Sequence, residues 1–363
     1  LIRGLTVKNY AAYTAFYGIS ALIPELVGSG INLAQVRFSS EYLSETGRKP
    51  LEVYLISFIS QIVLYTIFCT ILLLFADEVN GLLFGKGAFK SSFLYGLIAG
   101  FGLLLIQAGR SVYQAEEKFG TYVKPLWLTQ ILIFLLLSFL LLLKTLDFSR
   151  AAQSLVVVNL GVGAVITFHV FHRFSLRQTF ALFFHGRVRI FRNFLSSTRW
   201  LIAYFFMLSA FQRLDIFMLS HFSTGEELAN YGVAYRYYSM ALLLLGSIHA
   251  VLLPRFSKVD MQEPVKQRIF IFRWLKATGW LIIPVVIVDV LGKPVFVWVN
   301  GIQYEKAFYM FVIFSIGVWF SLMFSPLVNV LISRKAFRFL FALAVGAFIL
   351  NFIGNYLLIP LWG

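Results

Sequence analysis

Five charged residues lie inside long apolar stretches of this 363-residue sequence: Glu25, Arg213, Asp215, Arg236 and Asp289. A charge at the centre of a membrane costs on the order of 2.5–3.5 kcal/mol on insertion scales, so such groups usually face a polar cavity or a partner. Arginines suit phosphate, because the guanidinium forms charge-assisted and often bidentate hydrogen bonds with it. We therefore predict these five residues as candidates for a substrate path. Structural ion pairs between helices, or snorkelling to a nearby surface, are the alternative.

The spacing of these charges predicts part of their geometry. At about 1.5 Å per residue, Arg213 and Arg236 lie roughly 9–13 Å inside the ends of their apolar stretches, at similar depth. Arg213 and Asp215 project about 200° apart on a helix and cannot share a face. We predict that one arginine faces a cavity and that Asp215 orients the other.

Two of the acidic residues follow prolines. Pro24 precedes Glu25, and Pro284 lies five residues before Asp289. A proline inside a helix leaves a carbonyl in the preceding turn without its donor, which can bend the helix or line a polar path.

Other motifs predict neither a cofactor nor a metal. The glycine-rich stretch 81–87 is one residue short of a phosphate loop and lacks the Ser or Thr that would bind Mg²⁺. His169 and His172 have no third ligand nearby, and Cys69 is the single cysteine. We predict that the protein is not an enzyme and that transport would need an ion gradient, the membrane potential or a partner.

The elements that carry these charges are predicted to be membrane-spanning helices. Hydrophobic residues make up 60% of the chain and charged residues 13%, whereas soluble domains are about 25% charged. Windows of about 19 residues predict ten α-helical crossings, an all-α integral membrane protein. The predicted spans are 10–36, 51–76, 91–113, 122–143, 152–172, 195–219, 228–253, 277–298, 307–332 and 339–361.

Lys and Arg are distributed unequally between the alternate connections of these spans. One set of five connections holds 21 of them and the other side holds 8. Cytoplasmic loops carry the excess of positive charge in membrane proteins, so the first set is predicted to be cytoplasmic. The net charge of +15 is then explained by orientation, and we expect no nucleic-acid partner.

A faint internal repeat relates the two halves of the chain. Asn-Tyr-Ala at 9–11 parallels Asn-Tyr-Gly at 230–232, and Arg-Phe-Ser recurs at 37–39 and 255–257. The offsets are similar and both copies run in the same direction, which indicates a parallel repeat about an axis along the membrane normal.

The repeat predicts two pseudo-symmetric six-helix lobes around a central cavity, each incomplete in this chain. The N-terminal lobe is predicted at 1–175 without its first helix. A cytoplasmic linker follows at 176–194, and the C-terminal lobe at 195–363 lacks its last helix.

Several short stretches carry a family resemblance in order along the chain. They are 5–13, 36–37, 212–219, 227–236, 252–257 and 355–363. Together they resemble the polysaccharide (O-antigen type) flippases of the multidrug/oligosaccharidyl-lipid/polysaccharide exporter superfamily. The resemblance implies a fold of 12 or 14 helices in a bacterial or archaeal cytoplasmic membrane.

The same resemblance implies a substrate, an undecaprenyl-pyrophosphate-linked oligosaccharide moved between leaflets by alternating access. The arginine that faces the cavity would then bind the pyrophosphate. Membrane lipid and polysaccharide assembly proteins are further expected partners. Two alternatives stay open: a cation-coupled multidrug antiporter of the same superfamily, and a membrane polysaccharide polymerase or glycosyltransferase.

Overall fold

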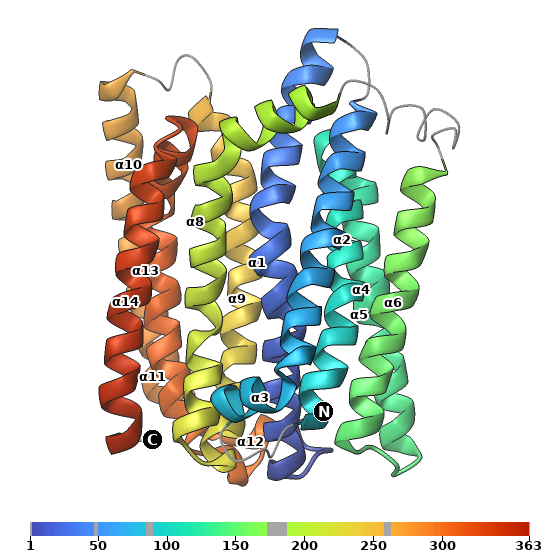
Figure 1. Ribbon diagram of the computed structural model, residues 1–363. Helices are drawn as coiled ribbons and strands as arrows, with labels where there is room; N and C mark the ends of the chain where they lie inside the picture. Colours follow the sequence, from blue (N-terminus) through green and yellow to red (C-terminus); the bar gives the residue numbers. More distant parts are fainter. Residues whose placement is uncertain (1, 47–49, 85–89, 173–186, 258–262, 363) are drawn as a thin grey trace.

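The computed structural model describes residues 2–46, 50–84, 90–172, 187–257 and 263–362, and this part of the chain is an upright bundle of long helices (Figure 1). The elements are α1 (Val7–Thr46), α2 (Leu51–Leu74), α3 (Ala76–Phe84), α4 (Lys90–Ala115), α5 (Phe119–Leu142), α6 (Phe148–Phe171), α8 (Arg187–Phe222), α9 (Gly225–Ser257), α10 (Pro264–Gly279), α11 (Ile282–Leu291), α12 (Lys293–Asn300), the 3₁₀ turn η2 (Ile302–Tyr304), α13 (Ala307–Ser333) and α14 (Phe337–Trp362).

The expected all-helical membrane fold is confirmed. Among the described residues, nine segments are helical, long and apolar enough to cross a membrane. The remaining expected crossing, 228–253, lies in α9, which runs through the bundle beside α8 and α1 (Figure 1). Large apolar side chains cover the outer surface of the helices; Phe134 of α5, for example, is 69% exposed. Such a surface matches a lipid environment.

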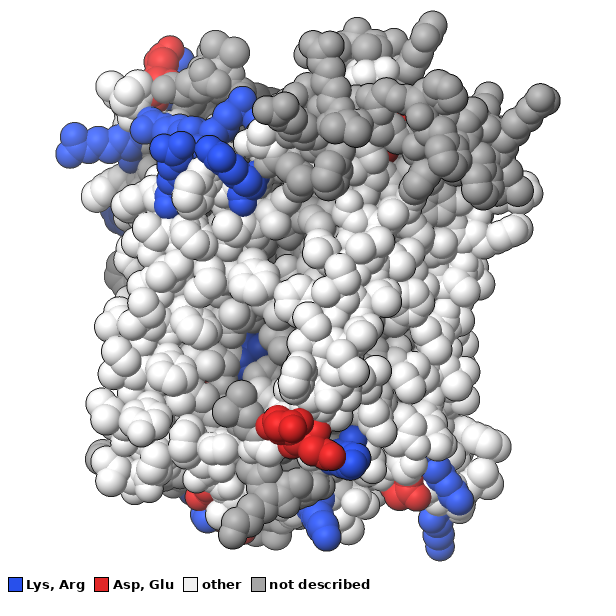
Figure 2. All heavy atoms as spheres, viewed as in Figure 1, with Lys and Arg blue, Asp and Glu red and all other residues white. Residues whose placement is uncertain are grey.

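Successive connections alternate between the two ends of the bundle (Figure 1). The turns after α5, α8 and α12 lie at the lower end with both chain termini, and the turns after α4 and α13 lie at the upper end. Basic side chains gather at the upper end, over α10 and the neighbouring end of α14 (Figure 2). The described connections of the two predicted sets therefore lie at opposite ends of the bundle, and the cytoplasmic assignment of the upper set stays a prediction.

One predicted crossing, 277–298, has different bounds. The membrane-spanning segment runs from Pro264 to Leu291 and consists of α10 and α11. Basic residues in α10 lowered its apparent hydropathy, which moved the predicted start too far along the chain. Pro284 cannot donate to the carbonyl of Trp280, and the helix breaks at residues 280–281.

The predicted linker is partly helical. Residues 187–194 of the 176–194 segment form the first turns of α8, which cross the top of the bundle before the helix descends (Figure 1). The rest of that segment lies outside the described residues. The lobe boundaries themselves stay predictions.

Corresponding helices pack against each other in the two halves of the chain. In the first half α1 packs along α4, and in the second α9 packs along α13. A short lower-end helix follows the second crossing in each half, α3 in one and α12 in the other. This order agrees with a parallel repeat; a superposition of residues 10–143 on 228–361 remains its test.

Glycines permit the close approach of α1 to its neighbours. A Cβ on Gly100 of α4 would lie 2.9 Å from the Ser20 carbonyl of α1, and one on Gly30 of α1 would lie 2.6 Å from the Ile202 backbone of α8. Small residues at such crossings let backbones approach within a membrane. Thus α1 of the first half is packed directly on α8 of the second.

Candidate substrate pathway

The first buried charge cluster joins the two halves of the molecule. The guanidinium of Arg213 on α8 donates two hydrogen bonds to the Glu25 carboxylate on α1, of which the Nε–Oε2 bond is 2.9 Å. Arg213 is 5% exposed and also donates to the Tyr235 hydroxyl on α9, at 3.1 Å. In a bidentate, buried pair of this kind, each partner neutralises the charge of the other.

Arg236 has very different surroundings. On α9, its guanidinium lies over the Tyr13 ring at 5.1 Å, and Tyr10 and Tyr17 are close by. No carboxylate forms a salt bridge with it among the residues that the structure describes. Arg236 is thus a cation inside a predicted membrane-spanning segment, and its contacts in the described part of the chain are with tyrosines.

Arg213 and Arg236, predicted to lie at similar depth, share neighbouring tyrosines. Arg213 lies over the Tyr17 ring at 5.6 Å, Tyr17 is also close to Arg236, and Tyr235 precedes Arg236 in the chain. Tyr17 and Tyr235 therefore lie between Arg213, which is paired with Glu25, and Arg236, which has no acidic partner among the described residues.

Asp215 does not orient either arginine, so that prediction is wrong. Its carboxylate accepts hydrogen bonds from Asn351 and Asn355 of α14, at 2.8 and 2.7 Å, and from the Tyr231 hydroxyl at 3.2 Å. The predicted divergence of Arg213 and Asp215 explains this outcome: Arg213 turns toward α1, whereas Asp215 turns toward α14. Asp215 therefore joins α8 to α14 within the second half.

Asp289 lies apart from the cluster. It accepts a hydrogen bond from Ser315 of α13 at 2.8 Å, and α11, which carries it, has no buried residue. The described contacts of α11 are with α12 and α13. The structure therefore brings together Glu25, Arg213 and Arg236, with Asp215 one tyrosine away, and leaves Asp289 at the periphery.

A polar cavity of about 350 Å³ lies above the Glu25–Arg213 pair, in the upper half of the bundle. Its walls come from α1, α4, α8 and the first turn of α5. The lining residues are Glu25, Ser29, Asn32, Gln107, Arg110, Ser111, Gln114, Tyr122, Phe205, Leu208, Ser209 and Gln212. Amides and hydroxyls predominate, and Arg110 is held over the Tyr122 ring at 4.1 Å. Glu25 lines this cavity, so the ion pair lies at its deep end.

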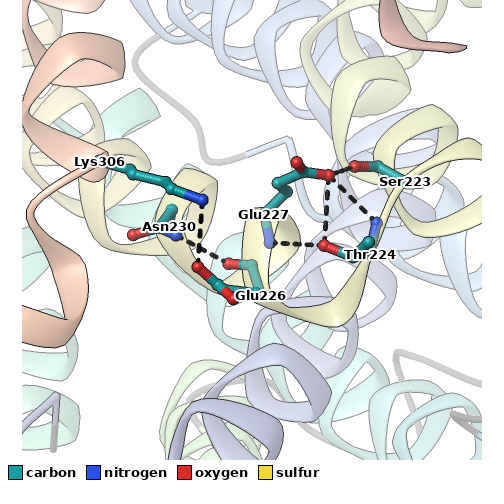
Figure 3. Close-up of polar contacts among 6 residues, drawn as sticks. All are labelled: Ser223, Thr224, Glu226, Glu227, Asn230 and Lys306. Atoms are coloured by element: carbon teal, nitrogen blue, oxygen red, sulfur yellow. Dashed lines mark hydrogen bonds and ion pairs between the residues drawn. The ribbon is translucent and has the colours of Figure 1, made fainter. Parts of the chain in front are cut away.

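A second cavity, of about 660 Å³, lies at the lower end between α1, α4 and the α8–α9 turn. This turn is well ordered by hydrogen bonds (Figure 3). The Thr224 hydroxyl accepts from the Glu227 backbone N–H at 3.3 Å, and the Thr224 backbone N–H donates to the Glu227 carboxylate at 3.2 Å. This is a capping box at the start of α9. The Ser223 hydroxyl, which also donates to this carboxylate, is the largest cause that lowers the pKa of Glu227.

Comparison with known proteins identifies the family. A family model described as "Polysaccharide biosynthesis protein" matches residues 1–260. The chain belongs to this family. No curated protein matches the chain.

A solved structure matches this member of the polysaccharide biosynthesis proteins over most of its length. That structure is described as "Inward-facing conformation of a multidrug resistance MATE family transporter of the MOP superfamily"; the match has a TM-score of 0.66 and 14% identity and covers 97% of this chain and 91% of that one. At this identity the likeness concerns the fold. The family and the fold agree with the resemblance to the flippases of this exporter superfamily, and the nine apolar helices of the described residues identify a multi-pass membrane protein.

The polar cavity of this family member was not predicted from the sequence, although the spacing of its polar lining residues is visible there. Glu25, Ser29 and Asn32 recur at i, i+4 and i+7 on α1, and α4 carries Gln107 and Arg110 on a similar stripe. Such spacing marks one helix face.

Proposed function

We propose that the protein is a flippase that carries a lipid-linked oligosaccharide, linked through pyrophosphate to an undecaprenyl chain, across a bacterial or archaeal cytoplasmic membrane. It acts as a carrier by alternating access and not as an enzyme. The observation that carries this proposal is Arg236, a cation inside the bundle with no salt-bridge partner among the described residues.

The charge balance of the cluster favours an anionic substrate. Glu25 is neutralised by Arg213, and Asp215 is satisfied by Asn351 and Asn355. Among the described residues this leaves two inner cations without a salt bridge, Arg236 in the cluster and Arg110 in the wall of the polar cavity. A guanidinium suits pyrophosphate through bidentate hydrogen bonding. Nearby tyrosine hydroxyls can donate further hydrogen bonds.

The polar cavity supports a sugar headgroup. Its amides and hydroxyls can exchange hydrogen bonds with sugar hydroxyls, and its deep end at Glu25 is connected through Arg213, Tyr235 and Tyr17 to the surroundings of Arg236. In this arrangement the sugar would occupy the cavity while the pyrophosphate reaches Arg236. The Glu25–Arg213 pair lies between these two regions and would move as α1 and α8 rearrange during transport.

The test uses the purified protein in proteoliposomes that contain undecaprenyl-pyrophosphate-linked oligosaccharide. The measured quantity is the rate at which the sugar becomes accessible to an added glycosidase. Arg236→Ala is expected to lower this rate about 100-fold, and Arg236→Lys to restore it partly, because Lys keeps the charge and lacks the planar fork. Lys306→Ala, on the surface near the α8–α9 turn, is the matched control and should transport normally.

Two results would overturn the proposal. One is full oligosaccharide transport by a correctly inserted Arg236→Ala protein. The other is efflux of a cationic dye by the wild type, driven by an ion gradient, without any oligosaccharide transport, which would support the multidrug antiporter instead.

A further inference from the structure

A groove between α10 and α13 has the composition of a lipid-binding site. It has a volume of about 360 Å³ and lies at the upper end of the bundle, away from the polar cavity. Its lining residues are Pro264, Gln267, Arg268, Ile271, Phe272, Leu275, Val330 and Arg334. Polar and basic residues therefore line the same groove as apolar ones.

These two kinds of residue lie at different depths. Arg268 is in the second turn of α10, and Arg334 caps the end of α13. Ile271, Phe272 and Leu275 follow one to two turns deeper on α10. The groove is thus basic at its outer end and apolar toward the membrane interior.

At the basic end, Arg334 is held in place, and neither arginine has an acidic partner among the described residues. Arg334 donates to the Gln267 side chain at 2.6 Å, and Gln267 is 5% exposed. Among the described residues, no salt bridge involves Arg268 or Arg334; the nearby acid Glu263 pairs with Lys266 at 3.2 Å. Two guanidinium groups are therefore available to a phosphate.

The helix of the first half that corresponds to α10 lacks these basic residues, so the fold does not require them. α2 follows α1 as α10 follows α9, yet α2 has Glu52 as its single charged residue. α10 carries Lys266, Arg268, Arg273 and Lys276 within 16 residues. The groove therefore distinguishes the second half from the first.

We propose that this groove binds an anionic phospholipid, with the phosphate of the headgroup at Arg268 and Arg334 and an acyl chain along the apolar wall. Basic pockets between transmembrane helices bind such headgroups, and exposed Phe272, 69% accessible, supplies an apolar contact. The site is separate from the substrate pathway, so its occupant stabilises the α10–α13 contact rather than being carried.

Native mass spectrometry of the purified protein tests this proposal. Dioleoyl phosphatidylglycerol and dioleoyl phosphatidylcholine are titrated in parallel, together with inorganic phosphate. The wild type should bind phosphatidylglycerol more tightly than phosphatidylcholine. Arg268→Gln/Arg334→Gln should weaken the phosphatidylglycerol adduct roughly thirtyfold, given the usual contribution of two basic groups near an anionic lipid.

The matched control removes the same charge from the same helix. Arg273→Gln/Lys276→Gln lies outside the groove lining and should bind phosphatidylglycerol as the wild type does.

Equal losses in both double variants would mean a diffuse charge effect, and equal binding of the two lipids by the wild type would mean no headgroup recognition. Saturation by inorganic phosphate that leaves phosphatidylglycerol binding unchanged would place the anion site elsewhere. Each of these results would overturn the proposal. Thermal midpoints of both variants without lipid verify that they fold.

Discussion

The surroundings of Arg213 and Arg236 differ although the two residues are at similar depth on successive helices. Arg213 is enclosed by Glu25 and Tyr235 and connects the two halves of the bundle. Arg236 lies among Tyr10, Tyr13 and Tyr17 without a salt bridge in the described part of the chain.

This difference is the basis for assigning a structural role to Arg213 and, under the proposed function, substrate binding to Arg236. A buried ion pair loses much stability when one partner is removed, because the other charge is left uncompensated. A cation held by aromatic rings leaves no opposite charge behind when it is removed. Replacing Arg213 should therefore mainly lower the stability of the protein, whereas replacing Arg236 should mainly lower its transport rate.

The largest expected effect is on stability at the paired arginine. Arg213→Ala leaves the Glu25 carboxylate inside the membrane without its cation, which costs about 3–5 kcal/mol. We expect a large fall in membrane abundance and in the thermal midpoint of the purified protein. Arg236→Ala removes a cation–π contact of about 1 kcal/mol and should remain abundant. Equal abundance of the two variants would contradict the comparison.

A double variant sharpens the same comparison. Glu25→Gln/Arg213→Gln removes both charges and keeps hydrogen-bonding side chains at each position, so the desolvation cost of an unpaired charge disappears. We expect its abundance and thermal midpoint to recover most of the loss seen in Arg213→Ala. The single variant Glu25→Gln is the control, and it should be destabilised because Arg213 then lacks its anion. No recovery in the double variant would show that the pair is not the main source of the loss.

Asp215 is expected to give an intermediate effect. Asp215→Asn keeps an acceptor for the amides of Asn351 and Asn355 and loses the charge that strengthens these bonds, a difference of about 1–2 kcal/mol. Asp215→Ala should cost more, because both amides then lose their acceptor. The glycosidase assay should show transport by Asp215→Asn close to the wild type. A loss of transport as complete as that of Arg236→Ala would restore Asp215 to the pathway.

The smallest effect concerns the capping box at the lower end. The pKa of Glu227 is lowered in the folded protein, chiefly by the Ser223 hydroxyl. Its contribution is therefore present at neutral pH and is lost as the pH falls below the ordinary Glu value of about 4.3. Glu227→Gln should lower the thermal midpoint slightly at pH 7, by the equivalent of about 0.5–1 kcal/mol. The difference from the wild type should shrink as the pH is lowered through the folded-state pKa of Glu227; a difference that grows on acidification would contradict this assignment.

Much of the fold was predictable because it depends on properties that are local in the chain. Apolar length defines crossings, and the alternation of Lys and Arg between connections predicted two sets whose described members lie at opposite ends of the bundle. The predicted bounds of the 277–298 span were wrong because α10 carries basic residues within the crossing itself, and these residues lower its hydropathy. The polar stripe on α1 and α4 could also have been recognised from its spacing.

The partners of the charges required the tertiary structure. The sequence by itself determined that Arg213 and Asp215 point apart and that Arg213 and Arg236 have similar depth, because helix periodicity and rise are constant. It did not determine that Arg213 meets Glu25, 188 residues earlier, or that Asp215 meets α14. Those choices depend on how each helix is rotated about its axis and which neighbour it faces. These are set by close packing at Gly30 and other crossings far apart in the chain.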